Sequence, residues 1–156
     1  MIERVNTKNY TECAWLLEFL TSNMDYDFYF TEDNTRIYIT DMQSLKRLFK
    51  SSEHIFYLKE YGDVVGVILV WKSEGGGKER KYVKLSAKNF GVARDLLTVL
   101  MWNCFDDLYF KIRKDSKLIP VVRHKGFRFE GGRGSQILLK GKAKEYVSFS
   151  SKDKDE

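Results

Sequence analysis

A short segment near the middle of the chain combines a helix start with a glycine, and this combination suits a phosphate group. Its sequence is KNFGVA at positions 88–93, followed by RDLL at 94–97. Free backbone N–H groups at a helix start, together with the helix dipole, attract an anion. Gly91 has no side chain, so the backbone can approach the phosphates closely. Residues 81–97 therefore predict a strand, a tight turn and a helix start that receive a pyrophosphate.

Other phosphate-binding arrangements fit this segment less well. A P-loop requires Gly-Lys-Ser/Thr, and a dinucleotide-binding fold requires a triple-glycine fingerprint with an acidic ribose partner; neither is present. The three glycines at 75–77 predict a loop tip, because no helix start follows them. A glycine followed two residues later by an alanine also occurs by chance. A plain strand-to-helix turn that binds nothing therefore stays an alternative.

Hydrophobic periodicity predicts the elements that must position this turn. Apolar residues at helical spacing predict a helix that follows Thr7 and carries the pattern from Tyr10 to Leu20, and further helices at 41–50, 91–103 and 116–124. Alternating or continuous apolar runs predict strands at 2–5, 55–60, 64–72, 81–85, 108–112, 127–130 and 136–140. The aromatic segment 25–41 predicts either a hairpin or an ordered loop around Asp33-Asn34. Together these segments indicate a mixed α/β domain.

The composition fits one domain of ordinary size. The 156 residues are 43% apolar, which is enough to bury a core over residues 1–142, and the charged tail at 143–156 is expected to be flexible. The net charge of +5, from 27 basic and 22 acidic residues, suits an anionic ligand or a solvated surface. No RNA-recognition or zinc-ligand motif accompanies this charge, so the sequence disfavours a nucleic-acid partner.

The cysteines and the first residues of the chain bear on its location. Cys13 and Cys104 fall in helical patterns with apolar neighbours, which predicts buried free thiols and not a disulfide framework. The first residues lack the pattern of a signal peptide, and no run approaches the roughly 20 apolar residues of a membrane span. We therefore expect a cytoplasmic protein without a membrane partner.

The segment at 88–93 resembles motif A of the GNAT N-acetyltransferase superfamily, whose pattern is Gln/Arg-x-x-Gly-x-Gly/Ala, with Lys88 at the first position. The order of the elements around it, and the ending Lys125-Gly126-Phe127 before a final hairpin, also resemble this family over roughly residues 2–140. The resemblance implies an α/β fold, a central mixed, mostly antiparallel, twisted sheet of about six or seven strands flanked by about four helices.

The resemblance also implies an activity. Acetyl-coenzyme A (acetyl-CoA) would be the co-substrate, no metal would be needed, and an amine of a small molecule or protein would attack the thioester directly. Backbone groups at the end of the strand 81–85 would lie near the acetyl carbonyl. A homodimer is compatible with the family.

Roles for single residues follow from the same resemblance. Cofactor contacts are implied for Leu85, Ser86, Lys88, Asn89, Phe90, Gly91, Val92, Ala93, Arg94, Ser116 and Arg123. Acceptor contacts are implied for Tyr26, Tyr29 and Tyr38, and Lys84 could attract an acidic substrate. The candidates for a catalytic role are Ser86 and His124.

Two features depart from the family pattern. The tyrosine that usually protonates the leaving thiolate is replaced by Val122, which has no proton to give. The strand 81–85 also contains no carboxylate that could serve as a base. The sequence therefore leaves a second function open, a catalytically degenerate GNAT-fold module that binds a protein partner, or a nucleic acid through its basic surface.

Overall fold

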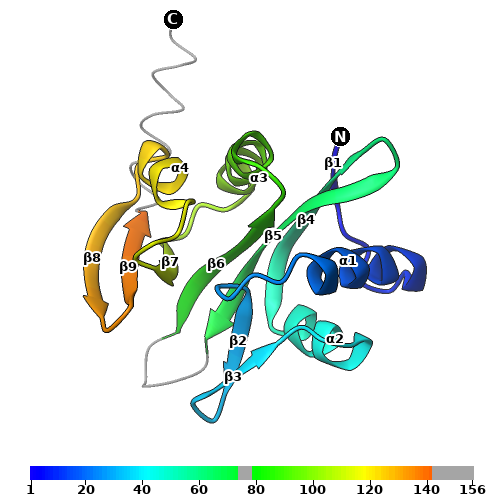
Figure 1. The fold of residues 1–156 in the computed structure, drawn as a ribbon, viewed down its shortest axis with the longest axis horizontal. Helices are drawn as coiled ribbons and strands as arrows, with labels where there is room; N and C mark the ends of the chain where they lie inside the picture. The colour runs from blue at the N-terminus through cyan, green and yellow to red at the C-terminus, as the bar shows by residue number, and fades with distance from the viewer. Residues whose placement is uncertain (74–78, 142–156) are drawn as a thin grey trace, which may run out of the picture.

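The computed structural model describes residues 1–73 and 79–141, which form nine strands and four helices (Figure 1). Seven strands form one sheet in the order β1-β4-β5-β6-β7-β9-β8. Along this order their bounds are Ile2–Arg4, Ser52–Glu60, Asp63–Ser73, Arg80–Ala87, Leu108–Arg113, Gln136–Gly141 and Arg128–Arg133. All neighbours are antiparallel except β6 and β7, which run parallel. The expected mixed, mostly antiparallel sheet is thus confirmed, while the loop tip at 75–77 and the tail at 143–156 lie outside the described residues.

The segment 25–41, for which the sequence left two alternatives, contains a hairpin. Strands β2 (Tyr29–Glu32) and β3 (Thr35–Tyr38) pair with each other in a separate two-stranded sheet. The turn residues Asp33 and Asn34 both have positive φ, at 49° and 64°. Asp and Asn tolerate this left-handed conformation better than other side chains, which explains why the chain reverses there.

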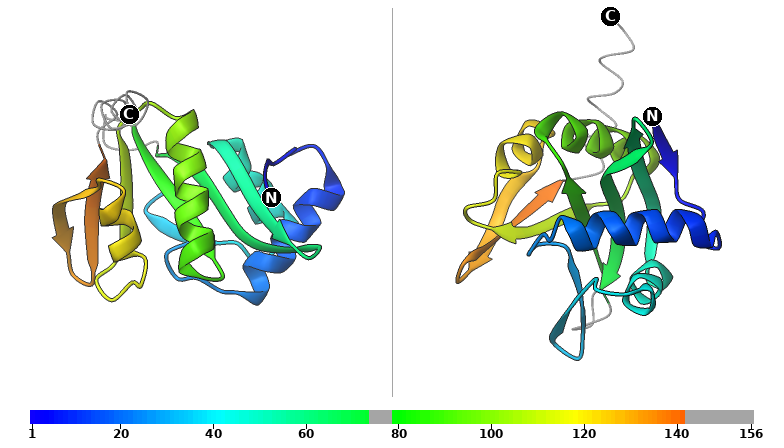
Figure 2. Two further views of the ribbon diagram at one scale, coloured as in Figure 1. Left: turned by 90° about the horizontal axis from the view of Figure 1, so that it is seen from above. Right: turned by 45° about the vertical axis from the view of Figure 1, so that its right-hand side comes forward.

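The four helices cover both faces of the sheet (Figure 2). Helices α1 (Tyr10–Ser22) and α2 (Met42–Lys50) pack on one face together with the β2–β3 hairpin, and α3 (Phe90–Asn103) and α4 (Ile119–His124) cover the other. Successive strand residues point to opposite faces of the sheet. Val67 of β5 therefore joins the core cluster on the face of α1 and α2, and Ile68 joins the cluster on the face of α3 and α4. No helix in the described part of the chain is long and apolar enough to cross a membrane.

A capping side chain sets the start of α1, and a proline accompanies the start of α4. Helix α1 begins at Tyr10 because the Asn9 side chain accepts a hydrogen bond from the Glu12 N–H at 3.0 Å. Helix α4 begins at Ile119, later than expected, with Pro120 in its first turn, where a proline is tolerated. The expected segment 116–124 is therefore a turn followed by a shorter helix.

One glycine sets how closely α3 approaches the sheet. A Cβ atom on Gly66 of β5 would lie 2.6 Å from Cγ1 of Val92 and 2.7 Å from Cδ1 of Leu96. Both side chains are buried on α3, so they have little room to move. Gly66 thus fixes the seating of the helix whose first turn carries the predicted phosphate site.

Candidate functional site

The parallel strands β6 and β7 separate at the end of β6 where the site is expected. Strand β5 pairs with β6 along its whole length, from Arg80 to Ala87. Within the described residues, β6 and β7 pair only at Tyr82 and Tyr109, near the start of β6. The second half of β6 therefore has one edge whose backbone groups pair with no neighbouring strand, and an extended ligand can use such an edge.

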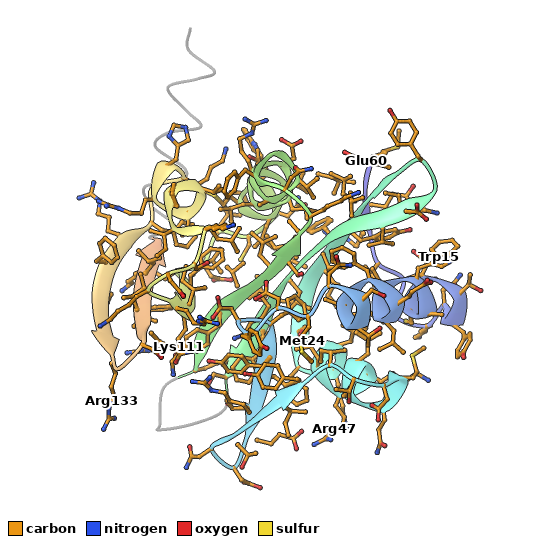
Figure 3. All side chains as sticks on the ribbon, in the orientation of Figure 1. Trp15, Met24, Arg47, Glu60, Lys111 and Arg133 are labelled. Atoms are coloured by element: carbon orange, nitrogen blue, oxygen red, sulfur yellow. The ribbon has the colours of Figure 1, made fainter. Side chains whose placement is uncertain are left out.

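A cavity of about 700 Å³ lies at this end of β6. Three segments line it: residues 22–27 after α1, Ser86 and Ala87 at the end of β6, and the turn after β7 with Arg113 and residues 115–117. Met24, labelled in Figure 3, marks the first of these segments. The cavity is therefore bounded by the end of the strand that precedes motif A and by the loop between α1 and the hairpin.

The first turn of α3 follows directly after the cavity wall. The Asn89 side chain caps it by accepting a hydrogen bond from the Val92 N–H at 2.9 Å. Across residues 1–73 and 79–141, the N–H groups of Phe90 and Gly91 donate no hydrogen bond. A Cβ atom on Gly91 would meet only the side-chain oxygen of Asn89, at 3.4 Å. Packing of the protein does not demand a glycine here, whereas close approach of an anion would.

The other residues predicted to contact the cofactor differ in how far their side chains are buried. Leu85, Val92 and Ala93 have buried side chains in the core, so they can offer backbone groups only. The side chains of Lys88 and Arg94 are exposed beside the α3 start. Ser116 lines the cavity, and Arg123 lies over the Phe129 ring at 4.8 Å.

Among the residues predicted to contact an acceptor, Lys84 has the most unusual surroundings. It is only 3% exposed, and its ammonium nitrogen lies 4.3 Å from the centre of the Tyr29 ring and 5.6 Å from that of Trp71. No hydrogen bond or ion pair joins it to another residue of the described chain. Burial lowers the pKa of Lys84 to about 7, although the carboxylates of Asp27 and Asp25 act in the opposite direction. Lys84 is therefore largely uncharged above neutral pH.

Asp25 and Asp27 are the site residues that the sequence did not single out. Both line the cavity, and burial raises the pKa of each carboxyl group. The negative charge of Asp25 raises the pKa of Asp27 further. One oxygen of Asp27 accepts a hydrogen bond from the Arg113 N–H at 3.2 Å, which ties this loop to the end of β7. The Asp-x-Asp spacing before the hairpin was the available signal, because two acidic residues at i and i+2 in a turn can act together.

The predicted acceptor tyrosines lie in different settings. Tyr26 is 59% exposed and lines the cavity. Tyr29 is buried, and its hydroxyl accepts a hydrogen bond from the side-chain amide of Gln136 at 3.0 Å. Tyr29 thus forms part of the wall around Lys84, and only Tyr26 borders the cavity.

Comparison with known proteins gives a structural answer only. No protein-family model matches the sequence, and no curated protein matches it. A ribosomal-protein-alanine N-acetyltransferase from Brucella melitensis superposes with a TM-score of 0.68 at 13% identity, over 90% of this chain and 98% of that chain. An acetyltransferase of the GNAT family from Streptococcus pneumoniae gives 0.66 at 11% identity, over 90% and 98%. A Salmonella typhimurium protein assigned as an acetyltransferase, solved with its cofactor acetyl-CoA, gives 0.67 at 14% identity, over 92% and 93%.

The chain has the GNAT fold. The superpositions cover nearly all of this chain and of each of those chains, so the whole domain shares the architecture. Within the GNAT fold, the strand-turn-helix unit β6–α3 is the segment that the sequence matched to motif A. The observed fold thus confirms the element order on which the resemblance depended.

Two expected features of GNAT chemistry are placed by the structure. Val122 of α4, which the sequence matched to the usual tyrosine position, is fully buried in the core cluster that also contains residues of α3. His124 is exposed at the end of α4 and does not line the cavity, whereas Ser86 is buried and does. Of the two candidates for a catalytic role, Ser86 lines the cavity and His124 does not.

A second group of polar side chains lies at the opposite end of β6. Single atoms of Glu53, His54 and Cys104 fall within 4.8 Å of one another. The ammonium group of Lys81 lies 2.8 Å from a Glu53 oxygen and 2.7 Å from an Asp106 oxygen. Lys81 therefore balances both carboxylates from within the protein, and we assign this cluster a structural role in joining β4, β6 and the end of α3.

Proposed function

We propose that this protein is an acetyl-CoA-dependent N-acetyltransferase that transfers an acetyl group to an amine of a small molecule or protein. The observation that carries this proposal is the meeting of two features at the end of β6. One is the first turn of α3, with an open glycine position and two N–H groups that donate to no residue in the described part of the chain. The other is a cavity of about 700 Å³ on the opposite side of the strand end, large enough for an acceptor.

The chain offers a distinct group for each part of the co-substrate. The N–H groups of Phe90 and Gly91, with the positive end of the α3 dipole, would hold the pyrophosphate. The unpaired edge of β6 at Leu85 and Ser86 would align the extended arm of coenzyme A by backbone hydrogen bonds. Acetyl-CoA itself supplies the acetyl group as a thioester. The likeness to a structure that holds acetyl-CoA supports this placement.

The missing tyrosine does not remove the route to products. A thiol is acidic enough for its thiolate to leave without a strong acid, as the unperturbed pKa of about 8.5 for a cysteine thiol illustrates. The demanding step is loss of a proton from the attacking amine, which is protonated near neutral pH. Groups on the acceptor side of the cavity therefore matter more to this protein than a replacement for tyrosine at Val122.

Calorimetric titration with acetyl-CoA tests the cofactor site. We expect saturable binding to the parent protein and a loss of affinity of at least about 100-fold in Gly91→Glu, because the new carboxylate displaces and repels the phosphates. Gly131→Glu is the matched control, since a Cβ atom on this exposed β8 glycine meets nothing within 4 Å. Equal affinity of Gly91→Glu and the parent, or no binding to the parent, would contradict the proposal.

The alternative function, a degenerate GNAT-fold binding module, is favoured by one observation, the burial of Val122 in place of a tyrosine. Such a module would bind coenzyme A or a macromolecule and consume no thioester. Incubation with acetyl-CoA and a panel of amines separates the two functions, because only an enzyme releases coenzyme A in proportion to the amine present.

A further inference from the structure

Each carboxylate of the Asp25–Asp27 pair keeps one oxygen atom free of hydrogen bonds from described residues. Oδ1 of Asp25 accepts the N–H of Asp27 at 2.9 Å, and Oδ1 of Asp27 accepts the N–H of Arg113 at 3.2 Å. No lysine or arginine of the described chain forms an ion pair with either residue. Two partly buried carboxylates that border a cavity without a cationic partner are costly to the protein alone.

The positive groups nearby do not cancel this negative charge. Lys84 and Arg113 act on both carboxylates at a distance. The guanidinium of Arg113 is already 2.9 Å from a carboxylate oxygen of Asp115. Lys84 loses its charge near pH 7 because it is buried among aromatic rings. Lys117 borders the cavity from the turn after β7, and it forms no ion pair with Asp25 or Asp27 within the described residues.

We propose that the cavity receives the acetyl acceptor as an ammonium ion, bound between the free carboxylate oxygens of Asp25 and Asp27. The acceptor class that fits is an aliphatic primary amine, which is protonated near neutral pH, and not an aromatic amine, which is uncharged there. This inference rests on the proposed function, because the cavity adjoins the predicted acetyl-CoA site. Ser86 at the end of β6 lies in the same cavity wall, so an amine held there lies beside the strand end that would carry the thioester.

Lys84 gives this site a characteristic pH dependence. Protonated Lys84 repels an ammonium ion, and neutral Lys84 does not. Amine binding is therefore expected to strengthen as the pH rises from 6 to 8, through the lowered pKa of Lys84. In Lys84→Met the part of this rise that comes from Lys84 disappears, whereas a merely structural role for Lys84 would leave the pH profile unchanged.

The test measures amine binding to the protein saturated with coenzyme A, which carries no acetyl group and therefore permits no turnover. The probes are spermidine, 2-phenylethylamine and the tripeptide Ala-Lys-Ala, with 2-phenylethanol as the uncharged analogue of the second. We expect at least one amine to bind, 2-phenylethanol not to bind, and Asp25→Asn and Asp27→Asn each to weaken amine binding at least tenfold. Asparagine keeps the Oδ1 acceptor of both hydrogen bonds, so both variants are expected to fold.

Asp33→Asn is the matched control, because Asp33 sits in the hairpin turn with a φ of 49°, a conformation that asparagine accepts readily. Coenzyme A binding without binding of any amine would overturn this inference alone, as would Asp→Asn variants that bind amines as tightly as the parent. Failure of coenzyme A to bind the parent protein would overturn the proposed function as well.

Discussion

Replacing Lys84 by methionine should stabilise the protein, and by an amount that depends on pH. The pKa of Lys84 falls from 10.5 to about 7 on folding, and at about 1.4 kcal/mol per pKa unit this difference is about 5 kcal/mol. Methionine has a similar length, and its sulfur packs well against aromatic rings such as Tyr29. After allowance for imperfect packing, we expect Lys84→Met to unfold with a free energy about 2–4 kcal/mol above the parent at pH 7.

The sign of the pH dependence follows from the lowered pKa. Between pH 7 and pH 10.5 the unfolded chain holds a proton on Lys84 that the folded protein does not, so the stability of the parent rises with pH over this range. The advantage of Lys84→Met is therefore greatest at and below pH 7 and shrinks by about 2 kcal/mol between pH 7 and pH 9.

Urea unfolding at pH 6, 7, 8 and 9 measures this difference. Lys8→Met, in the exposed segment before α1, is the control for a lysine that does not act on Lys84. Groups other than Lys84 titrate in both proteins, so their contributions cancel in the comparison. A difference in unfolding free energy that stays constant across this pH range would mean that Lys84 keeps an ordinary pKa. That result would refute both the buried position of its amine and the pH dependence expected for the acceptor site.

Two further predictions concern the frame that holds the site. Gly66→Ala should lower the unfolding free energy by about 1–3 kcal/mol, because the new methyl group overlaps Val92 and Leu96. Gly91→Ala, whose methyl group has room, should change the unfolding free energy by less than about 0.5 kcal/mol. Urea unfolding of both variants checks this contrast. Tyr57→Phe should cost about 1–2 kcal/mol in the same assay, because the buried Tyr57 hydroxyl lies 2.9 Å from a Glu3 oxygen and 3.1 Å from a Glu12 oxygen.

The fold could be predicted largely because its signals are local. The strand before motif A, the turn and the amphipathic helix α3 each show their own periodicity, and the observed helix starts at Phe90, one residue before the expected position. The sequence predicts that β8 ends at Glu130, because the glycines that follow usually mark a turn. The structure continues β8 through Gly131 and Gly132 to Arg133 by pairing with β9, which a local signal cannot report.

The residues around the cavity could not be predicted in the same way. Asp25 and Asp27 precede β2 by a few residues, but they meet Ser86 and Arg113 only because the loop after α1 folds across the ends of β6 and β7. Lys84 was expected to contact an acceptor. Its burial among Tyr29, Trp71 and Tyr82 depends on the hairpin packing against the sheet face, and no spacing in the sequence encodes that contact.

Release of coenzyme A tests the central claim most directly. The protein is incubated with acetyl-CoA at pH 8, with and without spermidine, 2-phenylethylamine or Ala-Lys-Ala, and the free thiol is followed with a chromogenic disulfide. We predict that at least one amine accelerates thiol release and gains one acetyl group by mass spectrometry, and that Gly91→Glu loses this activity while Gly131→Glu keeps it. Tight binding of acetyl-CoA without amine-dependent thiol release would contradict the enzyme and favour a GNAT-fold binding module.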